Sequence, residues 1–335
     1  MKRLAVALAA AAIVTGLAMP AAYAGRTPDY FHFGASNNVS LSVQWSQQLF
    51  APGVTDVAIL VRSDSFADSL AAGALAGALD APVLMTPPSE GLHPSVAAEL
   101  NRLEVDVVLV IGGTAAVSDE VMDDLAAEGY DATRIAGANR LATAADVADG
   151  PGYDGVDTVY LARAFGDGSS AFADSLGAGM LAGSQAVPLL ITDTNTLSQE
   201  ARDAITAHGS VSHVVIIGGT AAVSGTVENQ LTAMGLDVER IAGPTRFETA
   251  ALIADQSFDP GRSRIVAVVD GLSSNSWASG YPASAAAGGA VVLTNGASVP
   301  DPTRSFLESQ DTGHVYCAPE VDHDACLQVE ALLNG

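Results

Sequence analysis

Short apolar runs alternate with longer segments of helical spacing along most of this chain. In its middle third the runs contain mainly Val, Ile and Leu, which is typical of strands buried on both faces. The segments between them place small and apolar residues at helical intervals or carry one polar face. The pattern predicts strands over 158–162, 188–192 and 213–217, and helices over 173–182, 199–208 and 227–234. Alternating strands and helices predict an α/β fold with a parallel sheet covered on both faces.

The same order of elements occurs twice, at a constant offset of 106 residues. The eight residues Ile111–Ser118 recur unchanged as Ile217–Ser224. Two further segments keep the offset, namely 66–70 with 172–176 and 134–137 with 240–243. A constant offset over such a length indicates a duplicated unit.

A third, degenerate copy follows the first two. It has candidate strands at 291–294 and 315–317, but no Gly-Gly follows the second of these, and Trp277-Ala278-Ser279 stands where the other copies have Phe-Ala-Asp. We therefore expect three tandem Rossmann-like modules. The expected divisions are 25–137 for the first module with a short N-terminal lead-in, 138–243 for the second and 244–335 for the third.

Aligning the starts of the copies places Asn37 where the second copy has Arg140 and the third has Arg246. The second copy also carries an insertion, 165–169, after its first strand. Equivalent positions in different copies are therefore the natural places to look for shared function.

Residues 1–24 have the parts of a secretory signal peptide: a basic start, an apolar stretch and the small-x-small sequence Ala22-Tyr23-Ala24. The sequence has no cysteine near the expected cleavage site and no apolar C-terminal stretch. We expect an exported protein with no membrane span after signal cleavage and no covalent tether. The formal net charge of −24 argues against a nucleic-acid partner, which requires a basic surface.

Each intact copy has a glycine pair between its third strand and the next helix, Gly112-Gly113 and Gly218-Gly219. Glycine permits a positive φ and close backbone approach, and open α/β sheets bind ligands at this edge. The turns contain neither phosphate-binding glycine motif, so a purely structural role is the alternative. Ser224 is expected to cap the following helix.

Cys317 and Cys326 are the only cysteines, and in an exported chain they are expected to form a disulfide. Closing this short loop would contribute roughly 2–3 kcal/mol to the free energy of unfolding. A metal or redox pair is the alternative, although the spacing fits no zinc motif. We expect no bound metal and no cofactor.

The combined motifs resemble the cell wall binding repeat 2 (CWB2) family. That family's pattern is an Arg-x-x-Gly-x-x-Arg-x-x-Thr-Ala start, an Ala-Asp-Ser/Ala-Leu helix, a Pro-x-Leu-Leu-Thr strand and a Gly-Gly-Thr-Ala-Ala-Val-Ser turn. The second copy has all four, at 134–144, 173–176, 188–192 and 218–224. The first copy lacks the first of them, and the third copy has little beyond it, at 240–250.

The resemblance implies three modules packed as a pseudo-threefold triangle. It also implies a non-enzymatic surface or S-layer protein that attaches non-covalently to a secondary wall polymer of a Gram-positive-type envelope. Relatives often carry a separate effector domain, for which these three copies leave no room. The expected location is the cell wall or cell surface, after secretion.

Residues shared between copies are the candidates for polymer binding. Arg140 and Arg246 could capture an anionic group, or form a junction salt bridge to Asp68 or Asp174. The two aspartates could contact ligand or a cation, or simply cap a helix. The threonines at the strand ends, Thr86 and Thr192, could donate hydrogen bonds to a sugar, and a purely structural role is equally open. The remaining candidates are Thr86, Thr192, Gly112, Gly113, Gly218 and Gly219.

The acidity of the chain conflicts with an anionic polymer, because the long-range interaction would be repulsive, although salt screens it within about 10 Å. Binding would then need local arginines, helix N-termini or bridging divalent cations, unless the polymer is neutral. Two other functions fit an exported α/β protein: a wall-glycan hydrolase with an aspartate pair, and a soluble binder of small ligands. No candidate catalytic set has a fixed spacing in both copies.

Overall fold

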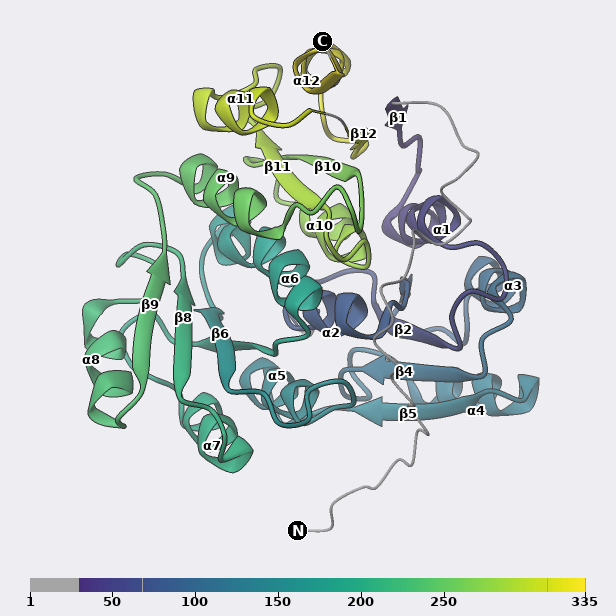
Figure 1. The fold of residues 1–335 in the computed structure, drawn as a ribbon. Helices are drawn as coiled ribbons and strands as arrows, with labels where there is room; N and C mark the ends of the chain where they lie inside the picture. Colours follow the sequence, from purple (N-terminus) through teal and green to yellow (C-terminus); the bar gives the residue numbers. More distant parts are fainter. Residues whose placement is uncertain (1–29, 68, 312, 335) are drawn as a thin grey trace.

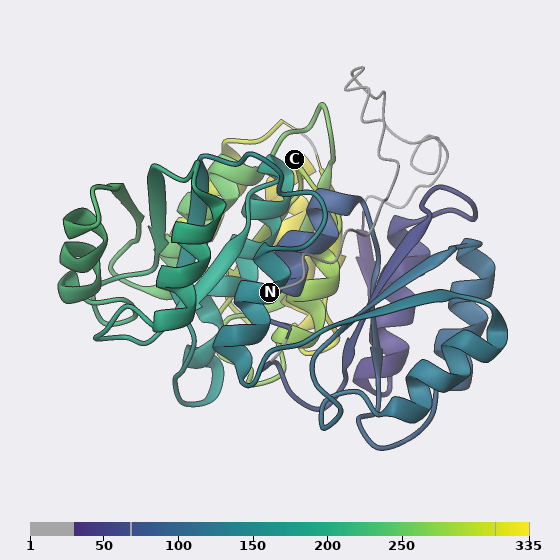
Figure 2. The ribbon, with the colours of Figure 1, turned by 90° about the horizontal axis from the view of Figure 1, so that it is seen from below.

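The computed structural model describes residues 30–67, 69–311 and 313–334, which form three separate four-stranded parallel sheets with helices on both faces. Figure 1 shows the three modules arranged around a group of central helices. From below, the first and second modules lie on opposite sides of the molecule (Figure 2). The α/β class and the triangular arrangement are thus confirmed. The signal peptide predicted at 1–24 lies outside the described residues.

The strands of the three sheets share one order. The first sheet runs β3-β2-β4-β5, the second β7-β6-β8-β9, and the third β11-β10-β12-β1. The strand bounds are β1 Tyr30–His32, β2 Val57–Arg62, β3 Val83–Thr86, β4 Val107–Ile111, β5 Asp131–Ile135, β6 Thr158–Arg163, β7 Leu189–Thr192, β8 His213–Ile217, β9 Asp237–Ile241, β10 Ile265–Asp270, β11 Ala290–Thr294 and β12 His314–Cys317.

The helices follow the same repeat. Those of the first module are α1 Asn38–Leu49, α2 Ala72–Leu79, α3 Pro94–Leu103 and α4 Asp119–Glu128. Those of the second are α5 Arg140–Ala148, α6 Ala173–Gln185, α7 Gln199–His208 and α8 Gly225–Ala233, with a short 3-10 turn, η1 Gly168–Ala171, before α6. Those of the third are α9 Arg246–Ser257, α10 Trp277–Ala283, α11 Asp301–Glu308 and α12 His323–Asn334.

The predicted elements of the second copy all exist, with ends that differ by a few residues. Helix α7 has the predicted bounds, whereas α6 continues to Gln185 and α8 begins at Gly225. Ser224 does occupy the N-cap position of α8, but its hydroxyl makes no capping hydrogen bond and is buried without a hydrogen-bond partner within residues 30–67, 69–311 and 313–334. The prediction that the Ser224 hydroxyl caps α8 is therefore wrong, although the residue stands at the expected position.

Strand β1 belongs to the third sheet, although the sequence division placed it in the lead-in of the first module. Tyr30, Phe31 and His32 pair in parallel with Val315, Tyr316 and Cys317 of β12. It takes the place that β5 and β9 hold in the other sheets, and the chain then continues into α1 of the first module. The first and last segments of the described chain thus close the three modules into a ring.

The centre of the ring is formed by α2, α6 and α10, which are built from small residues. Gly73, Gly179 and Ser284 occupy equivalent positions and meet there: a Cβ on Gly73 would lie 3.0 Å from Cβ of Ser284 and 3.5 Å from Cα of Gly179. One turn further along, a Cβ on Gly77 would lie 2.7 Å from Cα of Gly183. The sequence places glycine where the helix backbones come this close.

Two other features bear on the function. Cys317 at the end of β12 is joined by a disulfide to Cys326 in α12, and both residues are fully buried. Among the helices that the structure describes, none is long and apolar enough to cross a membrane.

Candidate functional site

The glycine pairs lie at the carboxyl ends of β4 and β8. Gly112 and Gly218 have φ values of +113° and +102°, a conformation that favours glycine, and their amides donate to the carbonyls of the adjoining fourth strands. Gly113 and Gly219 have no atom within 4 Å of an added Cβ. The first glycine of each pair therefore shapes the turn, and the second leaves backbone open to approach.

Two arginines hold these turns in place. Arg134 Nη1 donates to the carbonyls of Gly112 at 2.9 Å and Val117 at 2.8 Å. Arg240 Nη1 donates to the carbonyl of Gly218 at 2.7 Å. The sequence pattern includes both arginines only as part of the family motif, and their recurrence at the 106-residue offset is the signal that points to this role.

The first residue of α1, α5 and α9, here termed the opening residue, makes one contact in all three modules. It donates to the carbonyl of the residue directly after its own module's first strand. The bonds run from Asn38 Nδ2 to Ser63 O at 2.8 Å, from Arg140 Nη1 to Ala164 O at 2.9 Å, and from Arg246 Nη1 to Gly271 O at 2.6 Å. Asn38, not Asn37, is therefore the equivalent of the arginines, because Asn37 caps α1 as Asn139 caps α5.

Each opening residue also contacts the preceding module of the ring. Arg140 lies over the ring of Phe66, with Cζ 5.4 Å from the centroid, and Arg246 Nη1 donates to Ser169 Oγ at 2.8 Å. Asn38 and Asn275 exchange hydrogen bonds between their side-chain amides. These residues therefore lie at module junctions, with carbonyl, hydroxyl, amide and ring partners. Asp68, one of the two aspartates suggested as partners, lies outside the described residues.

Asp174 lies in the first turn of α6, where the structure records no side-chain cap. Its carboxylate instead packs on the turn, because a Cβ on Gly218 would lie 2.6 Å from Asp174 Oδ2. Burial raises the pKa of Asp174, and the charges of Arg163 and Arg246 partly offset that rise. Arg163 Nε is buried and has no hydrogen-bond partner in the part of the chain that the structure describes. Asp174, Gly218, Arg163 and Arg246 thus form one strand-end cluster between the second and third modules.

The strand-end threonines are fully buried. Thr192 Oγ1 donates to Thr196 O at 3.1 Å and accepts from Ser198 N at 2.8 Å, so its hydrogen bonds order the following loop. Thr86 Oγ1 has no hydrogen-bond partner among the described residues. Both hydroxyls therefore lie inside the strand ends of their modules.

The third module builds its strand end from different residues. Strand pairing places Glu320 where the second module has Gly219, and Asp270 where it has Arg163. Ser279, the counterpart of Asp174, is fully buried, and none of the described residues forms a hydrogen bond with its hydroxyl. Burial chiefly, with a contribution from the charge of Asp270, raises the pKa of Glu320 to about 7. The third module thus has its buried carboxyl group, Glu320, in the turn after the strand, whereas the second module has its own, Asp174, at the start of a helix.

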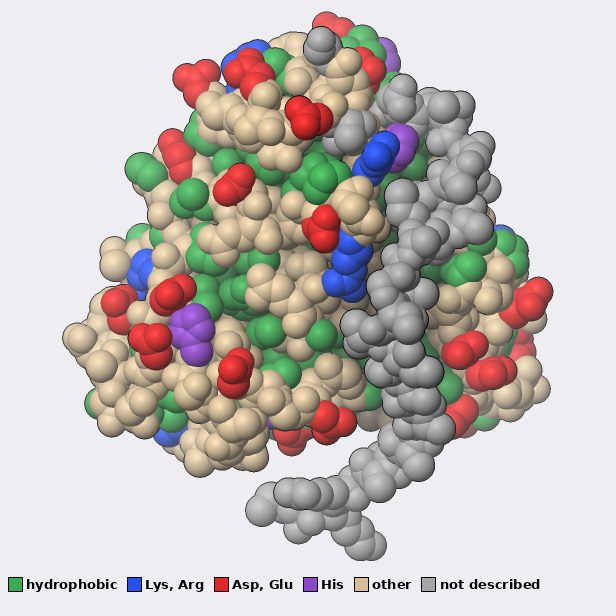
Figure 3. All heavy atoms as spheres, in the orientation of Figure 1, with side chains coloured by type: hydrophobic (Ala, Val, Ile, Leu, Met, Phe, Trp, Pro, Cys, Tyr) green, Lys and Arg blue, Asp and Glu red, His purple; other side chains and the backbone are tan. Residues whose placement is uncertain are grey.

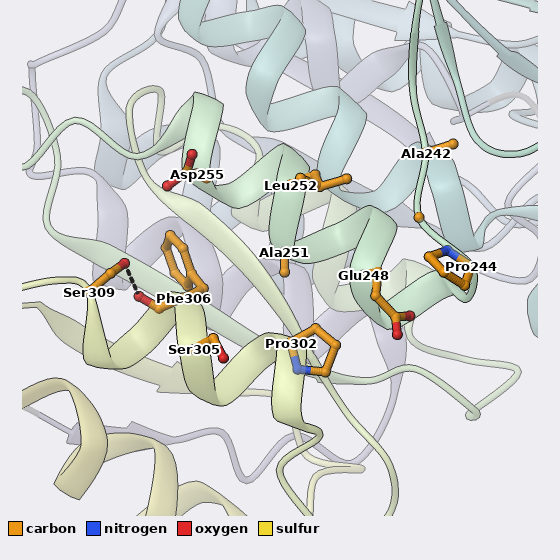
Figure 4. A pocket seen from close by; sticks show the side chains of 11 residues that line it. Ala242, Pro244, Glu248, Ala251, Leu252, Asp255, Pro302, Ser305, Phe306 and Ser309 are labelled. Atoms are coloured by element: carbon orange, nitrogen blue, oxygen red, sulfur yellow. Dashed lines mark hydrogen bonds between the residues drawn. The ribbon is translucent and has the colours of Figure 1, made fainter.

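A cavity of about 490 Å³ lies apart from these strand ends, between α9 and α11 (Figure 4). We call it the third-module groove. Its walls are one face of each helix and the turn after β9. The lining residues are Ala242, Gly243, Pro244, Glu248, Ala251, Leu252, Asp255, Pro302, Ser305, Phe306 and Ser309.

The described residues contain no group of three or more His, Cys, Asp or Glu side chains placed to hold a metal ion. Figure 3 shows basic side chains near the middle of one face, on a surface where acidic side chains are more numerous.

A family model for the cell wall binding domain 2 (CWB2) matches this chain three times, at 32–122, 134–228 and 240–318. Each match covers one of the three modules apart from its last elements. The N-acetylmuramoyl-L-alanine amidase LytC of Bacillus subtilis (strain 168) is 30% identical over 278 residues, which are 83% of this chain and 53% of that protein. The amidase enhancer of the same organism is 32% identical over 198 residues, 59% of this chain and 26% of that protein.

Two solved structures share the fold. Cwp6 from Clostridium difficile has a TM-score of 0.78 at 21% identity and covers 91% of this chain, which spans 48% of Cwp6. Cwp8 from the same organism has a TM-score of 0.76 at 21% identity, with 92% and 52% covered. The chain therefore spans about half the length, or less, of each of these proteins.

Proposed function

Because this chain belongs to the cell wall binding domain 2 (CWB2) family, we propose that it is an exported, non-enzymatic protein that attaches non-covalently to a secondary polymer of a Gram-positive-type wall. Export would use residues 1–24 as the signal peptide. The modules would divide near residues 137 and 243, with β1 counted in the third.

The observation that carries the proposal is the threefold repetition of one junction. The same donor position and the same carbonyl recur at Asn38, Arg140 and Arg246, and each of these residues also contacts the preceding module, through a different partner in each case. A polymer of repeating units can engage several such sites at once, and linked weak contacts then give a strong overall attachment. A single small ligand would occupy only one of three equivalent junctions.

Within these junctions, the strand-end cluster of the second module has the features of a contact site. Gly219 leaves backbone open, and Arg163 carries a buried donor, Nε, that has no hydrogen-bond partner among the described residues. A guanidinium suits anionic groups, and its action at short range is little affected by the overall negative charge. We propose that Arg163, Asp174, Gly218 and Gly219 contact the polymer, and that Arg246 positions Arg163 and Asp174 across the junction.

The test is co-sedimentation of the purified protein with isolated walls, before and after chemical removal of the secondary polymer. We expect the protein to pellet only with walls that keep the polymer, and denaturant to release it. Arg163→Ala should weaken pelleting while Arg202→Ala, on the outer helix α7, should not. Equal pelleting with stripped walls would contradict the proposed polymer partner.

A wall-glycan hydrolase is the second candidate, favoured by one observation. Asp270 and Glu320 form a carboxyl pair in which the pKa of Glu320 is raised to about 7, as for a general acid. Release of reducing ends from walls, lost in Glu320→Gln, would support this activity. No release at pH 5 to 8 would leave binding as the function.

A further inference from the structure

The third-module groove differs from the equivalent seams of the other two modules. In the first module the seam between α1 and α3 is filled by Glu99, which is 2% exposed and accepts from Ser46 Oγ at 2.5 Å and from Arg102 Nη2 at 2.6 Å. Arg102 also donates to Phe50 O, where α1 ends. The first seam is thus closed by polar contacts of its own.

The second seam is bridged at both ends. At the start of α5 and α7, Asn139 Nδ2 donates to Glu200 Oε1 at 3.2 Å. At their far ends, His208 Nε2 lies 3.9 Å from Asp149 Oδ1. Between α9 and α11, by contrast, the described residues form no hydrogen bond or ion pair, and the cavity of about 490 Å³ remains.

The lining of the groove is mainly apolar. Phe306 and Ala251 lie between the helices, Pro244 and Pro302 lie at one end, and Leu252 is 44% exposed at the rim (Figure 4). An exposed leucine beside an open cavity is apolar surface that a partner could bury. The floor therefore suits apolar side chains.

The charges on the rim are of one sign. Glu248 and Asp255 are both on α9, seven residues apart, so they lie on one face with about 10 Å between them along the helix. Hydrogen bonds from Thr245 lower the pKa of Glu248, which keeps it ionised. No lysine, arginine or histidine lines the groove. The ligand that complements it has cationic groups about 10 Å apart on an apolar body.

We propose that the third-module groove is a docking site for a basic, partly apolar peptide segment of another protein. A segment in the polyproline II conformation repeats every three residues and rises about 3.1 Å per residue, so lysines or arginines three positions apart would lie on one side, about 9 Å apart, and would face Glu248 and Asp255. The apolar residues between them would face Phe306 and Leu252. The net charge of −24 would further attract such a segment. The groove would let the wall-bound protein hold a second protein at the surface.

A peptide fits better than an amino-substituted glycan. Sugars present hydroxyls on most sides and need many polar partners, whereas the groove offers hydroxyls only at Ser305 and Ser309. The Ser309 hydroxyl already donates to Phe306 O at 2.6 Å. This inference does not depend on the proposed polymer contacts, which lie at other residues.

The experiment measures fluorescence anisotropy of a labelled hexapeptide, Gly-Lys-Leu-Ala-Lys-Gly, added to the full chain. The matched probe has glutamate in place of both lysines. We expect only the lysine peptide to bind, and Asp255→Asn to weaken it about tenfold, as loss of one charge-assisted contact predicts. Glu308→Gln removes an equal charge from α11 outside the groove and should leave the affinity unchanged.

Ser305→Phe should block the groove and abolish binding, while circular dichroism and wall co-sedimentation stay unchanged. Equal binding of the two peptides, or equal effects of Asp255→Asn and Glu308→Gln, would overturn the proposal. Competition by chitosan oligosaccharide at lower concentration than the lysine peptide would overturn it in favour of a cationic glycan.

Discussion

Single side chains at the start of α1, α5 and α9 connect the three modules. Arg246 is the clearest case, because one guanidinium nitrogen bonds Gly271 O in its own module and Ser169 Oγ in the preceding one. Ser169 belongs to the insertion of the second copy, so that insertion supplies a junction contact. The sequence alignment gave Asn37 as the first-module equivalent because it could not show which residue caps α1.

Arg246→Ala should destabilise the protein by about 1–3 kcal/mol, since a buried carbonyl loses its charged donor. The melting temperature should fall, and wall binding by the folded protein should weaken as well, because Arg163 and Asp174 lose the side chain that positions them. Thermal melts compared with Arg202→Ala, whose side chain lies on α7 away from any junction, provide the measurement. An unchanged melting temperature with lost binding would assign Arg246 to direct polymer contact.

Glu320 could not be identified from the sequence, because its place at the strand end depends on the register of β12 against β10. Its pKa rises from an ordinary 4.5 to about 7 in the folded state. The folded protein therefore retains a proton between these pH values that the unfolded chain releases. The free energy of unfolding therefore falls as pH rises from 4.5 to 7. Above pH 7 the ionised Glu320 lowers it by about 3 kcal/mol.

Glu320→Gln should remove that penalty. Urea unfolding should show the variant to be more stable than the parent by up to about 3 kcal/mol at pH 8, with the difference vanishing near pH 4. Glu308→Gln, which alters an exposed carboxylate, is the control. A constant difference at both pH values would show that titration of Glu320 is not the cause.

At the scale of elements, the strands and helices of the second copy could be predicted because its buried strands are nearly continuous apolar runs. The small residues of 173–182 predict the helix α6, but they do not predict its place at the centre beside α2 and α10. It depends on three segments from different modules meeting, as Gly77 meets Gly183. The pairing of β1 with β12 was missed for the same reason, since no local pattern marks it.

Gly183→Ala should destabilise the central helix contact by about 1–3 kcal/mol, although alanine has the higher helix propensity, because its Cβ would lie 2.7 Å from Cα of Gly77. Gly219→Ala adds the same methyl group at an open turn and should cost much less. Denaturant midpoints of the two variants decide the matter. Similar losses of stability in the two variants would mean that α2 and α6 can move apart at little cost in free energy.

The disulfide between Cys317 and Cys326 holds α12 to the end of β12. Non-reducing mass spectrometry of the exported protein should show two hydrogens fewer than the reduced form. Cys326→Ser should lower the free energy of unfolding by roughly 2–3 kcal/mol in the chain-entropy model. Two alkylatable thiols in the native protein would contradict the bond.

At the scale of the whole molecule, three modules with one strand order and one kind of junction form a ring around small-residue helices. The repeat predicts the three modules, and the resemblance to the CWB2 family implies their triangular packing. The candidate polymer residues stay predictions, because the sequence alone does not distinguish the strand-end threonines from the junction arginines. Their burial and partners separate them only in the folded chain.

Because β1, at the start of the described chain, pairs with β12, near its end, the fold does not require the chain to begin at β1. The side chain of Asn334, at the end of α12, accepts a hydrogen bond from Gly313 N beside the start of β12, and Tyr30 pairs with Val315 close by. A short linker could thus join residue 334 to residue 30, as two residues join α4 to β5 in the first module. A circular permutant reopened between Glu128 and Asp131 should keep the parent's circular dichroism spectrum and a single cooperative melt. In the permutant, β5 would be the first strand of the chain and would pair with β4, as β1 pairs with β12 in the parent. The position of the chain ends would then not determine the fold.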